Sequence, residues 1–342
     1  MASIKGCFLA LSSLSVLALA ACGSPSSDAG APTETDTAQT ETNTQTAIYR
    51  TEEELRTEFE AVLAQAKATS GPGSPAMWRL ADEDTTIHIL GTVHLLRPEL
   101  EWRSEAYEAA FEAADTIVFE VDMKSEAAQQ KIMTDFMARG MFQDGQTLRG
   151  VIPDAQEPVI EAALDSVGVP LDAMNTFEPW MTAVNLSVMK LQADGYAVDS
   201  GVEEVITREA VAAGKSFGYL EEISDQADAF DLLPMQDQLV YLYETAILLD
   251  ESSDMLDQLV DEWADGDVAG IASMVANPDG FGFNDAAYQS LIVKRNQNWI
   301  PVIEEMLEQP GTVLIAAGAG HFAGPDSVIT MLRDKGYEVT GP

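Results

Sequence analysis

Short apolar runs separated by much longer stretches with helical spacing constrain the fold of this chain most. The runs span residues 76–91, 116–122, 216–222 and 311–321, and the first contains a turn at residues 82–84. Runs of this length predict strands, and the stretches between them predict helices. Strands near both ends of the domain with helical blocks between them favour an α/β fold. We predict a central mixed β-sheet with flanking helices and a large helical insertion.

The N-terminus has the pattern of an export signal. Lys5 opens a short basic start, an apolar stretch follows, and small residues precede a cysteine, which is typical of a secretory signal. The segment Leu19-Ala20-Ala21-Cys22 resembles the bacterial lipobox, in which the cysteine becomes the lipidated first residue. We therefore expect a lipoprotein signal peptide at residues 1–21 and a lipid anchor on Cys22. An ordinary cleaved signal peptide is the alternative.

The residues after Cys22 predict a tether followed by one large domain. Residues 22–47 are acidic and rich in Ser, Thr and Pro, with almost nothing to bury, so we expect a disordered linker. Residues 48–342 are long enough for a single α/β domain. No Asp follows Cys22, which by resemblance to sorted lipoproteins favours the outer membrane. The expected location is the cell envelope, lipid-anchored at the periplasmic face of that membrane.

Charge and cysteine content exclude some partners and one source of stability. The chain has 18 basic and 57 acidic side chains, for a formal charge of −39. Nucleic acids and anionic membrane surfaces would repel such a chain. Of the cysteines, Cys7 would leave with the signal peptide, so Cys22 could form no intrachain disulfide. Stability must therefore come from burial.

Two of the three histidines occur as Gly-x-x-His directly after an apolar run, at His94 and His321. Open α/β sheets build ligand sites where strands end, so these two imidazoles could share a site if their strands are neighbours. A carboxylate from another strand end would complete a set of two imidazoles and one carboxylate. That set suits a divalent metal, which activates water for hydrolysis. Loop histidines with local hydrogen bonds are the alternative.

Three carboxylates and one further histidine need separate interpretations. Glu120 ends the apolar run at 116–122, where it can serve the site or simply face water. Glu221 and Glu222 end the run at 216–222 with the same ambiguity. His88 lies inside a predicted strand, so we interpret it as a packed or half-exposed residue rather than a ligand.

Several segments together resemble the TraB/GumN family, within the wider group that includes the TIKI proteins. The resemblance covers residues 75–342 and rests on segments such as "WRLADEDTTIHILGTVHLL", "ADTIVFEVD", "GVEEVITREAVAAGKSFGYLEE" and "GAGHFAGPDSVITMLRDKGYEV". TIKI proteins are metal-dependent proteases with two Gly-x-x-His motifs and no HExxH signature, which this chain also lacks. Three departures are Glu203, where relatives often have Asp, Glu222, where they often have Thr, and His88, where an aromatic residue is common.

The resemblance implies a site and an activity. His94, His321 and Glu120 become the candidate ligands of a divalent metal ion, with Glu120 either a ligand or the general base. Arg295 matches a recurrent family arginine and would stabilise a developing negative charge; a helix-surface salt bridge is the alternative. We therefore expect a metal-dependent hydrolase, a peptidase acting on a peptide or protein substrate. The alternative is a non-enzymatic envelope lipoprotein that binds a peptide or other ligand in the same cleft.

Overall fold

The computed structural model describes residues 49–276 and 285–342. The predicted signal peptide, Cys22 and the linker up to residue 47 lie outside the described residues. Within the two described ranges, no helix combines the length and the apolarity needed to cross a lipid bilayer. The anchor and the tether therefore stay predictions.

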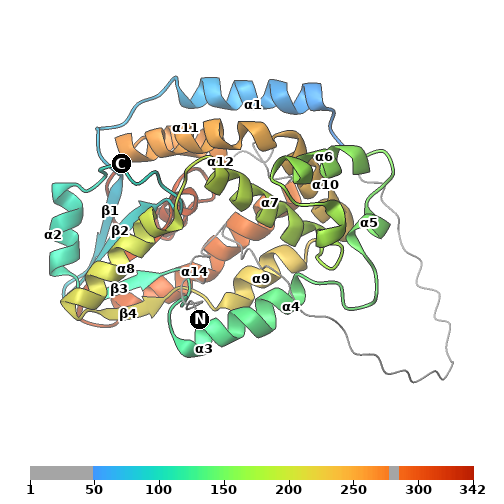
Figure 1. The fold of residues 1–342 in the computed structure, drawn as a ribbon. Helices are drawn as coiled ribbons and strands as arrows, with labels where there is room; N and C mark the ends of the chain where they lie inside the picture. The colour runs from blue at the N-terminus through green and yellow to red at the C-terminus, as the bar shows by residue number, and fades with distance from the viewer. Residues whose placement is uncertain (1–48, 277–284) are drawn as a thin grey trace.

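Six strands form one mixed sheet at one end of the molecule, on the left in Figure 1. They are β1 (Met77–Ala81), β2 (Thr85–Thr92), β3 (Thr116–Phe119), β4 (Ser216–Tyr219), β5 (Gly311–Gly318) and β6 (Val339–Thr340). Their order across the sheet is β4-β3-β5-β2-β1-β6. The four strands β4, β3, β5 and β2 are parallel, whereas β1 pairs antiparallel with β2 and β6. The predicted α/β fold with a mixed sheet is confirmed.

The parallel strands are covered on both faces, which explains their nearly continuous apolar sequences. Successive side chains point to opposite faces. Leu90 and Leu314 therefore belong to one hydrophobic core, whereas their neighbours Ile89 and Ile315 belong to another.

Two sets of helices cover these faces. One face packs against α2 (Glu105–Ala113), α8 (Val202–Ala213), α11 (Ser252–Asp265) and α12 (Val268–Val275). The other packs against α14 (Lys294–Leu307) and α15 (Val328–Asp334). The sheet is thus the middle layer of three. At its carboxyl edge, where the parallel strands end, the chain passes from the strands into the segments that lead to the helices.

The central part of the chain forms a helical region with its own core around Trp180, away from the sheet (Figure 1). Its helices are α3 (Glu126–Lys131), α4 (Met137–Arg139), α5 (Leu148–Val151), α6 (Glu157–Ser166), α7 (Pro179–Ala193), α9 (Ile223–Asp231), α10 (Met235–Ile247) and α13 (Asp285–Tyr288). This helical region matches the predicted helical insertion.

Short 3-10 or π segments occur in the helical region and beside the sheet. They are η1 (Ile132–Phe136), η2 (Leu171–Met174), η3 (Val198–Ser200), η4 (Leu249–Glu251), η5 (Gln289–Val293) and η6 (Ala319–Phe322).

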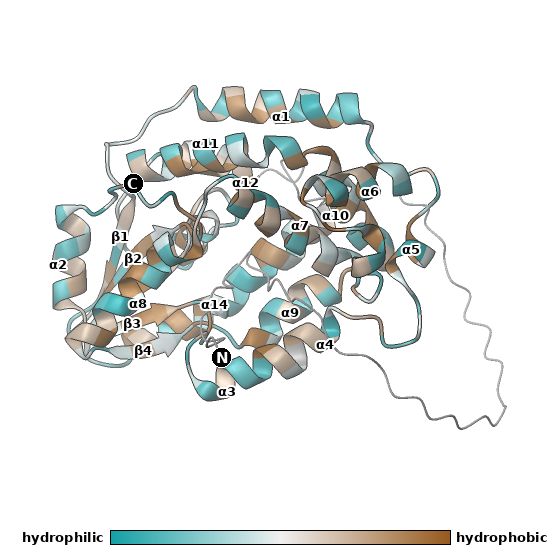
Figure 2. Cartoon of the chain, in the orientation of Figure 1, coloured by the Kyte–Doolittle hydropathy of each residue, from teal (hydrophilic) through white to brown (hydrophobic). Residues whose placement is uncertain are grey.

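Helix α1 (Glu52–Ala66) lies along α11 at the top of Figure 1 and contacts α10, α11 and α12. A capping box between Thr51 and Glu54 begins it, which satisfies otherwise unpaired backbone N–H groups. Its buried residues recur every three or four positions, and Figure 2 shows hydrophilic and hydrophobic patches alternating along it. This pattern is that of a surface helix with one apolar face.

Two predicted strands end earlier than their apolar runs. The runs at 116–122 and 216–222 form strands only as far as Phe119 and Tyr219. Beyond these positions, the N–H of Glu221 donates to the carbonyl of Glu120. Glu120 therefore follows β3 directly, and Glu221 lies two residues after its parallel neighbour β4.

Candidate active site

Four of the predicted site residues lie just past the ends of four neighbouring parallel strands. His94 follows β2, His321 follows β5, Glu120 follows β3 and Glu221 follows β4. Because β5 lies between β2 and β3, segments more than two hundred residues apart in sequence end at the same edge. Open α/β sheets bind ligands at this carboxyl edge. The sheet order therefore explains how these residues come together.

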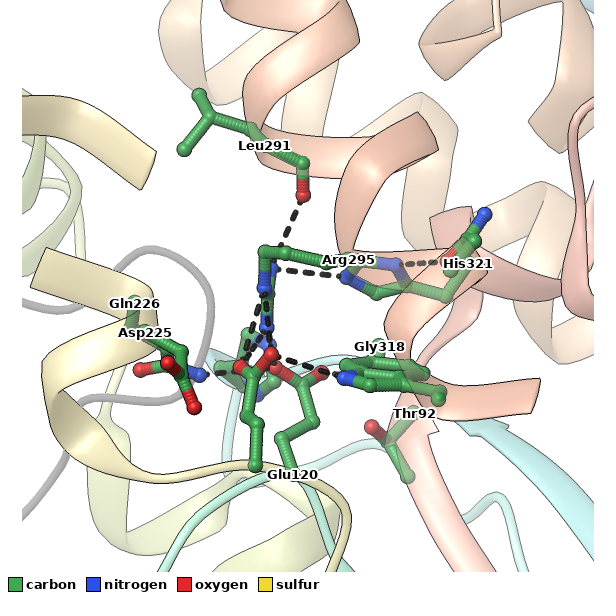
Figure 3. A network of polar contacts seen from close by, with 12 residues as sticks. Thr92, Glu120, Asp225, Gln226, Leu291, Arg295, Gly318 and His321 are labelled. Atoms are coloured by element: carbon green, nitrogen blue, oxygen red, sulfur yellow. Dashed lines mark hydrogen bonds and ion pairs between the residues drawn. The ribbon is translucent and has the colours of Figure 1, made fainter. Parts of the chain in front are cut away.

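Arg295 lies at the centre of this group, as Figure 3 shows. Its Nη2 donates to Glu120 and to Glu221, each at 2.6 Å, and its Nε donates to Glu221 at 3.0 Å. Its Nη1 donates to the Leu291 carbonyl at 3.1 Å and contacts His321 Nε2 at 3.1 Å. A guanidinium has five N–H groups, and each of these five has an acceptor within the protein.

The start of α14 supplies the groups that surround His321. Arg295 and Trp299 are four residues apart, so they lie on one face of the helix. The Trp299 indole donates to Glu221 Oε2 at 2.8 Å, and its ring centroid is 4.3 Å from that of His321. The π-helical segment η5 directly precedes this turn. Such irregularities in helices occur frequently at functional sites.

The two carboxylates that share Arg295 have different pKa values. Burial raises the pKa of Glu120, but Arg295, the two histidines and the Gly318 N–H outweigh burial and lower it to about 2. Burial raises the pKa of Glu221, and although Arg295 opposes this effect, the net shift is upward. Like charges close together push their pKa values apart, so Glu120 is the more acidic of the two carboxylates.

His321 is buried in a neutral form. Its Nδ1 lies 2.6 Å from Asn296 Oδ1, and the Asn296 amide nitrogen donates to the Asp326 carbonyl at 2.8 Å. This fixes Asn296 Oδ1 as an acceptor, so His321 Nδ1 carries the proton and Nε2 accepts from Arg295. Burial, together with the positive charge of Arg295, lowers the pKa of His321 to about 3.

His94 has an acidic partner instead. Its Nδ1 lies 2.6 Å from Glu203 Oε1, and the hydroxyl of Thr92 also donates to that oxygen. Burial lowers the pKa of His94, but Glu203, with a smaller contribution from Glu120, outweighs burial, so the pKa is raised. A carboxylate at Nδ1 orients the ring and stabilises its protonated form.

The pairing of His94 with Glu203 depends on a close backbone contact at the start of α8. The Val202 N–H donates to the Val93 carbonyl at 3.1 Å. A Cβ at Gly201 would lie 2.1 Å from the carbonyl oxygen of His94, so only glycine allows this approach. Glu203 is two residues further along the helix, where its side chain reaches the imidazole.

Both histidines line one cavity of about 250 Å³. Arg295 and Gly318 also line it, together with the end of β2 and the start of η6, whereas much of the remaining wall comes from α7, α10, α11, α12 and η5. The polar groups at the strand ends therefore face a space large enough for a ligand, and most of its other walls are aliphatic.

The predicted metal ligands contact other protein groups in this arrangement. Both nitrogens of His321 have partners, and the Glu120 oxygens accept from Gly318, Gln226 and Arg295. Within residues 49–276 and 285–342, no cluster of three or more His, Cys, Asp or Glu side chains is arranged to hold a metal ion. As arranged, the donor atoms do not fit a metal, and metal dependence stays a prediction.

The predicted site residues thus fall into two connected groups. Glu120, Glu221 and His321 all contact Arg295. His94 lines the same cavity as Arg295 and His321 but pairs with Glu203. His88 is half-buried on β2, as expected. Glu222 caps α9 and pairs with Lys131 at the surface, so this departure from the family pattern does not enter the cluster.

Sequence reasoning missed two partners of the histidines. Glu203 was noted only as a departure from the family pattern, and Asn296 was not singled out. A signal for each existed, because Glu203 follows Gly201 at a predicted helix start and Asn296 directly follows the family arginine.

Comparison with known proteins agrees with these motifs. A curated relative from Treponema pallidum (strain Nichols), described as "Uncharacterized protein", is 20% identical over 269 residues, which cover 75% of this chain and 80% of the relative. No solved structure matches the chain significantly. The model of the TraB/PrgY/gumN family matches residues 76–341, which include both histidine motifs and both histidine partners. The chain therefore belongs to the TraB/PrgY/gumN family.

Proposed function

We propose that this protein is a hydrolase that cleaves an amide or ester bond at the polar end of the cavity. One observation carries the proposal: His94, oriented by Glu203, lines the same cavity as Arg295 and His321. An imidazole held by a carboxylate is the usual general base for activating a nucleophile.

In the proposed reaction, water is the nucleophile. His94 removes a proton as the water oxygen adds to the carbonyl carbon, and it returns that proton to the leaving oxygen or nitrogen. Arg295 has a positioning role, since its five N–H groups hold Glu120, Glu221, His321 and a helix carbonyl. This differs from the expectation that Arg295 contacts the developing oxyanion. Glu120 in turn accepts a hydrogen bond from the backbone N–H of Gly318, and this hydrogen bond holds the end of β5 in place.

The test is hydrolysis of ester and peptide substrates by the purified protein. His94→Gln is expected to lower kcat/KM by about 10² to 10⁴, the usual contribution of a general base. Glu203→Gln should cause a smaller loss, because the base remains but its orientation is lost. Glu204→Gln is the matched control, since Glu204 lies on the same helix turn and pairs with Lys124. Unchanged turnover in His94→Gln would reject the proposal.

The divalent metal implied by the family resemblance is part of this proposal as a separate prediction. Metal content of the purified protein and of His94→Ala and His321→Ala tests it. Bound metal that is lost in both variants, together with activity lost on chelation, would support metal dependence. Full activity in metal-free protein would reject that prediction and leave the His94 mechanism in place.

A non-enzymatic binding protein is the second candidate, and the cavity favours it. A cavity of about 250 Å³ with largely aliphatic walls can bind a ligand even if the protein catalyses no reaction. Ligand binding that survives His94→Gln, without turnover in the unmodified protein, would favour this candidate.

We also propose that the protein is tethered to the cell envelope through lipid on Cys22, at the outer membrane. Mass spectrometry of the mature N-terminus tests the tether. A diacylated or triacylated Cys22 is expected, whereas an unmodified start at another residue would contradict it.

A further inference from the structure

The walls of the cavity are aliphatic over most of their extent. Its lining includes Val188 and Leu191 from α7, Met255, Leu256 and Leu259 from α11, and Met274 from α12. Aliphatic walls stabilise a bound apolar ligand, because the apolar surfaces of both leave water. They offer no hydrogen bonds to the polar groups of a ligand. Methionines add adaptability, because their flexible side chains follow irregular ligand shapes.

The hydroxyl and carboxylate groups along these walls are largely bonded to the protein. The hydroxyl of Ser187 donates to the Ala183 carbonyl, and that of Ser252 to the Leu248 carbonyl. Glu244 accepts two hydrogen bonds from Arg50, at 2.7 and 2.8 Å. An extended peptide would bring one N–H and one C=O per residue that need partners. An alkyl chain brings none.

We propose that the cavity binds a medium-length aliphatic acyl chain, with its carbonyl carbon beside His94. This inference rests on the proposed hydrolase function and names its substrate class: an acyl ester or acyl amide. An apolar cavity of about 150 Å³ accommodates benzene. By the same proportion, about 250 Å³ accommodates a chain of roughly ten carbon atoms.

The polar and apolar parts of the cavity fit the two parts of such a substrate. The chain occupies the aliphatic region, and the bond to be cleaved lies where His94 and His321 line the wall. Water adds its oxygen to the acyl carbon, and the bond from that carbon to the leaving oxygen or nitrogen breaks. The products are a carboxylic acid and an alcohol or amine, with no oxidant or cofactor needed.

The binding test uses straight-chain alcohols of six to twelve carbons, which cannot be hydrolysed. Affinity should rise about fourfold per methylene and level off near ten carbons. Leu256→Trp, which fills the cavity, should remove this dependence. Leu232→Trp is the matched control, since Leu232 is 65% exposed directly after α9 and does not line the cavity. Affinity independent of chain length in the unmodified protein would overturn the inference, even if Leu256→Trp failed to fold.

Turnover of acyl esters of increasing length separates this inference from the proposed function. Rising kcat/KM with chain length, lost in Leu256→Trp, supports both. Length-dependent alcohol binding without ester turnover supports the acyl site and rejects the hydrolase. Equal turnover of acetyl and decanoyl esters, unchanged in Leu256→Trp, supports the hydrolase and overturns the acyl site.

Discussion

The two Gly-x-x-His motifs have the same sequence pattern and equivalent places in the sheet, yet their histidines have opposite surroundings. His94 pairs with the acid Glu203, and its pKa is raised. His321 contacts the neutral Asn296 and the cation Arg295, and its pKa is lowered to about 3. The motif therefore sets where the imidazole lies, whereas helices α8 and α14 set its charge.

Because of this difference, the two histidines have different roles in the proposed mechanism. His94 is oriented by a carboxylate at Nδ1 and lines the cavity, which suits a general base. His321 stays neutral and connects Arg295 to Asn296, so it supports the cluster that includes Glu120 and Glu221. Two motifs that look like one symmetrical ligand pair in sequence are thus two unlike groups in the fold.

The two histidines also affect stability with opposite dependence on pH. The raised pKa of His94 adds stability that is fully present below the unfolded value of 6.5 and is lost as pH rises through the folded value. The lowered pKa of His321 means that the unfolded chain binds a proton first. Stability therefore falls as pH drops from 6.5 toward about 3. Glu120 adds to this acid loss between 4.5 and about 2.

The largest effect expected is from Arg295→Ala. This change leaves Glu120 and Glu221 buried without their cation and removes the positive charge next to His321. Loss of one partner from a buried ion pair typically costs about 3–5 kcal/mol of unfolding free energy, measured by denaturant unfolding. Arg208→Ala, at a side chain 55% exposed, is the control, with a change within about 0.5 kcal/mol. Similar losses in the two variants would contradict the account of the cluster.

A smaller effect is expected from Asn296→Asp, which gives His321 an acidic partner like that of His94. The pKa of His321 should rise, because the new carboxylate favours the protonated ring. The Asp326 carbonyl loses its donor, which costs about 1–3 kcal/mol of unfolding free energy. NMR titration gives the pKa, and denaturant unfolding gives the stability. If the pKa of His321 does not rise, burial rather than its partners controls its charge.

An effect of similar size, confined to a narrower pH range, is expected from Glu203→Gln, which makes the partner of His94 neutral. The pKa of His94 should fall, and any activity that needs the unprotonated ring should extend to lower pH. The stability deficit should be about 1–3 kcal/mol, largest below pH 6.5 and smaller as pH rises. Unfolding at several pH values checks this, with Glu204→Gln as the control. A deficit that grows with rising pH would have the wrong sign.

Much of the fold was predictable because the parallel strands are buried on both faces and so appear as apolar runs. The strand ends were less predictable, since the runs at 116–122 and 216–222 stop being strands at Phe119 and Tyr219. Arg295, Glu120 and the two motif histidines were identified from motifs and resemblance.

The partners that decide protonation could not be read from the motifs. Glu203 reaches His94 only because α8 begins against the end of β2, at a Gly201 that permits contact with the His94 carbonyl. Asn296 reaches His321 only because α14 packs beneath β5. These are tertiary contacts, and a residue pattern within one segment carries no information about which side chain faces it from another.

NMR titration of the imidazole protons tests the central claim most directly, since the chain contains only three histidines and each can be assigned by substitution. We predict that His94 titrates above 6.5 and that His321 stays unprotonated down to about 3. Titration of His321 at or above 6.5, with His94 titrating below it, would contradict the account of the two motifs.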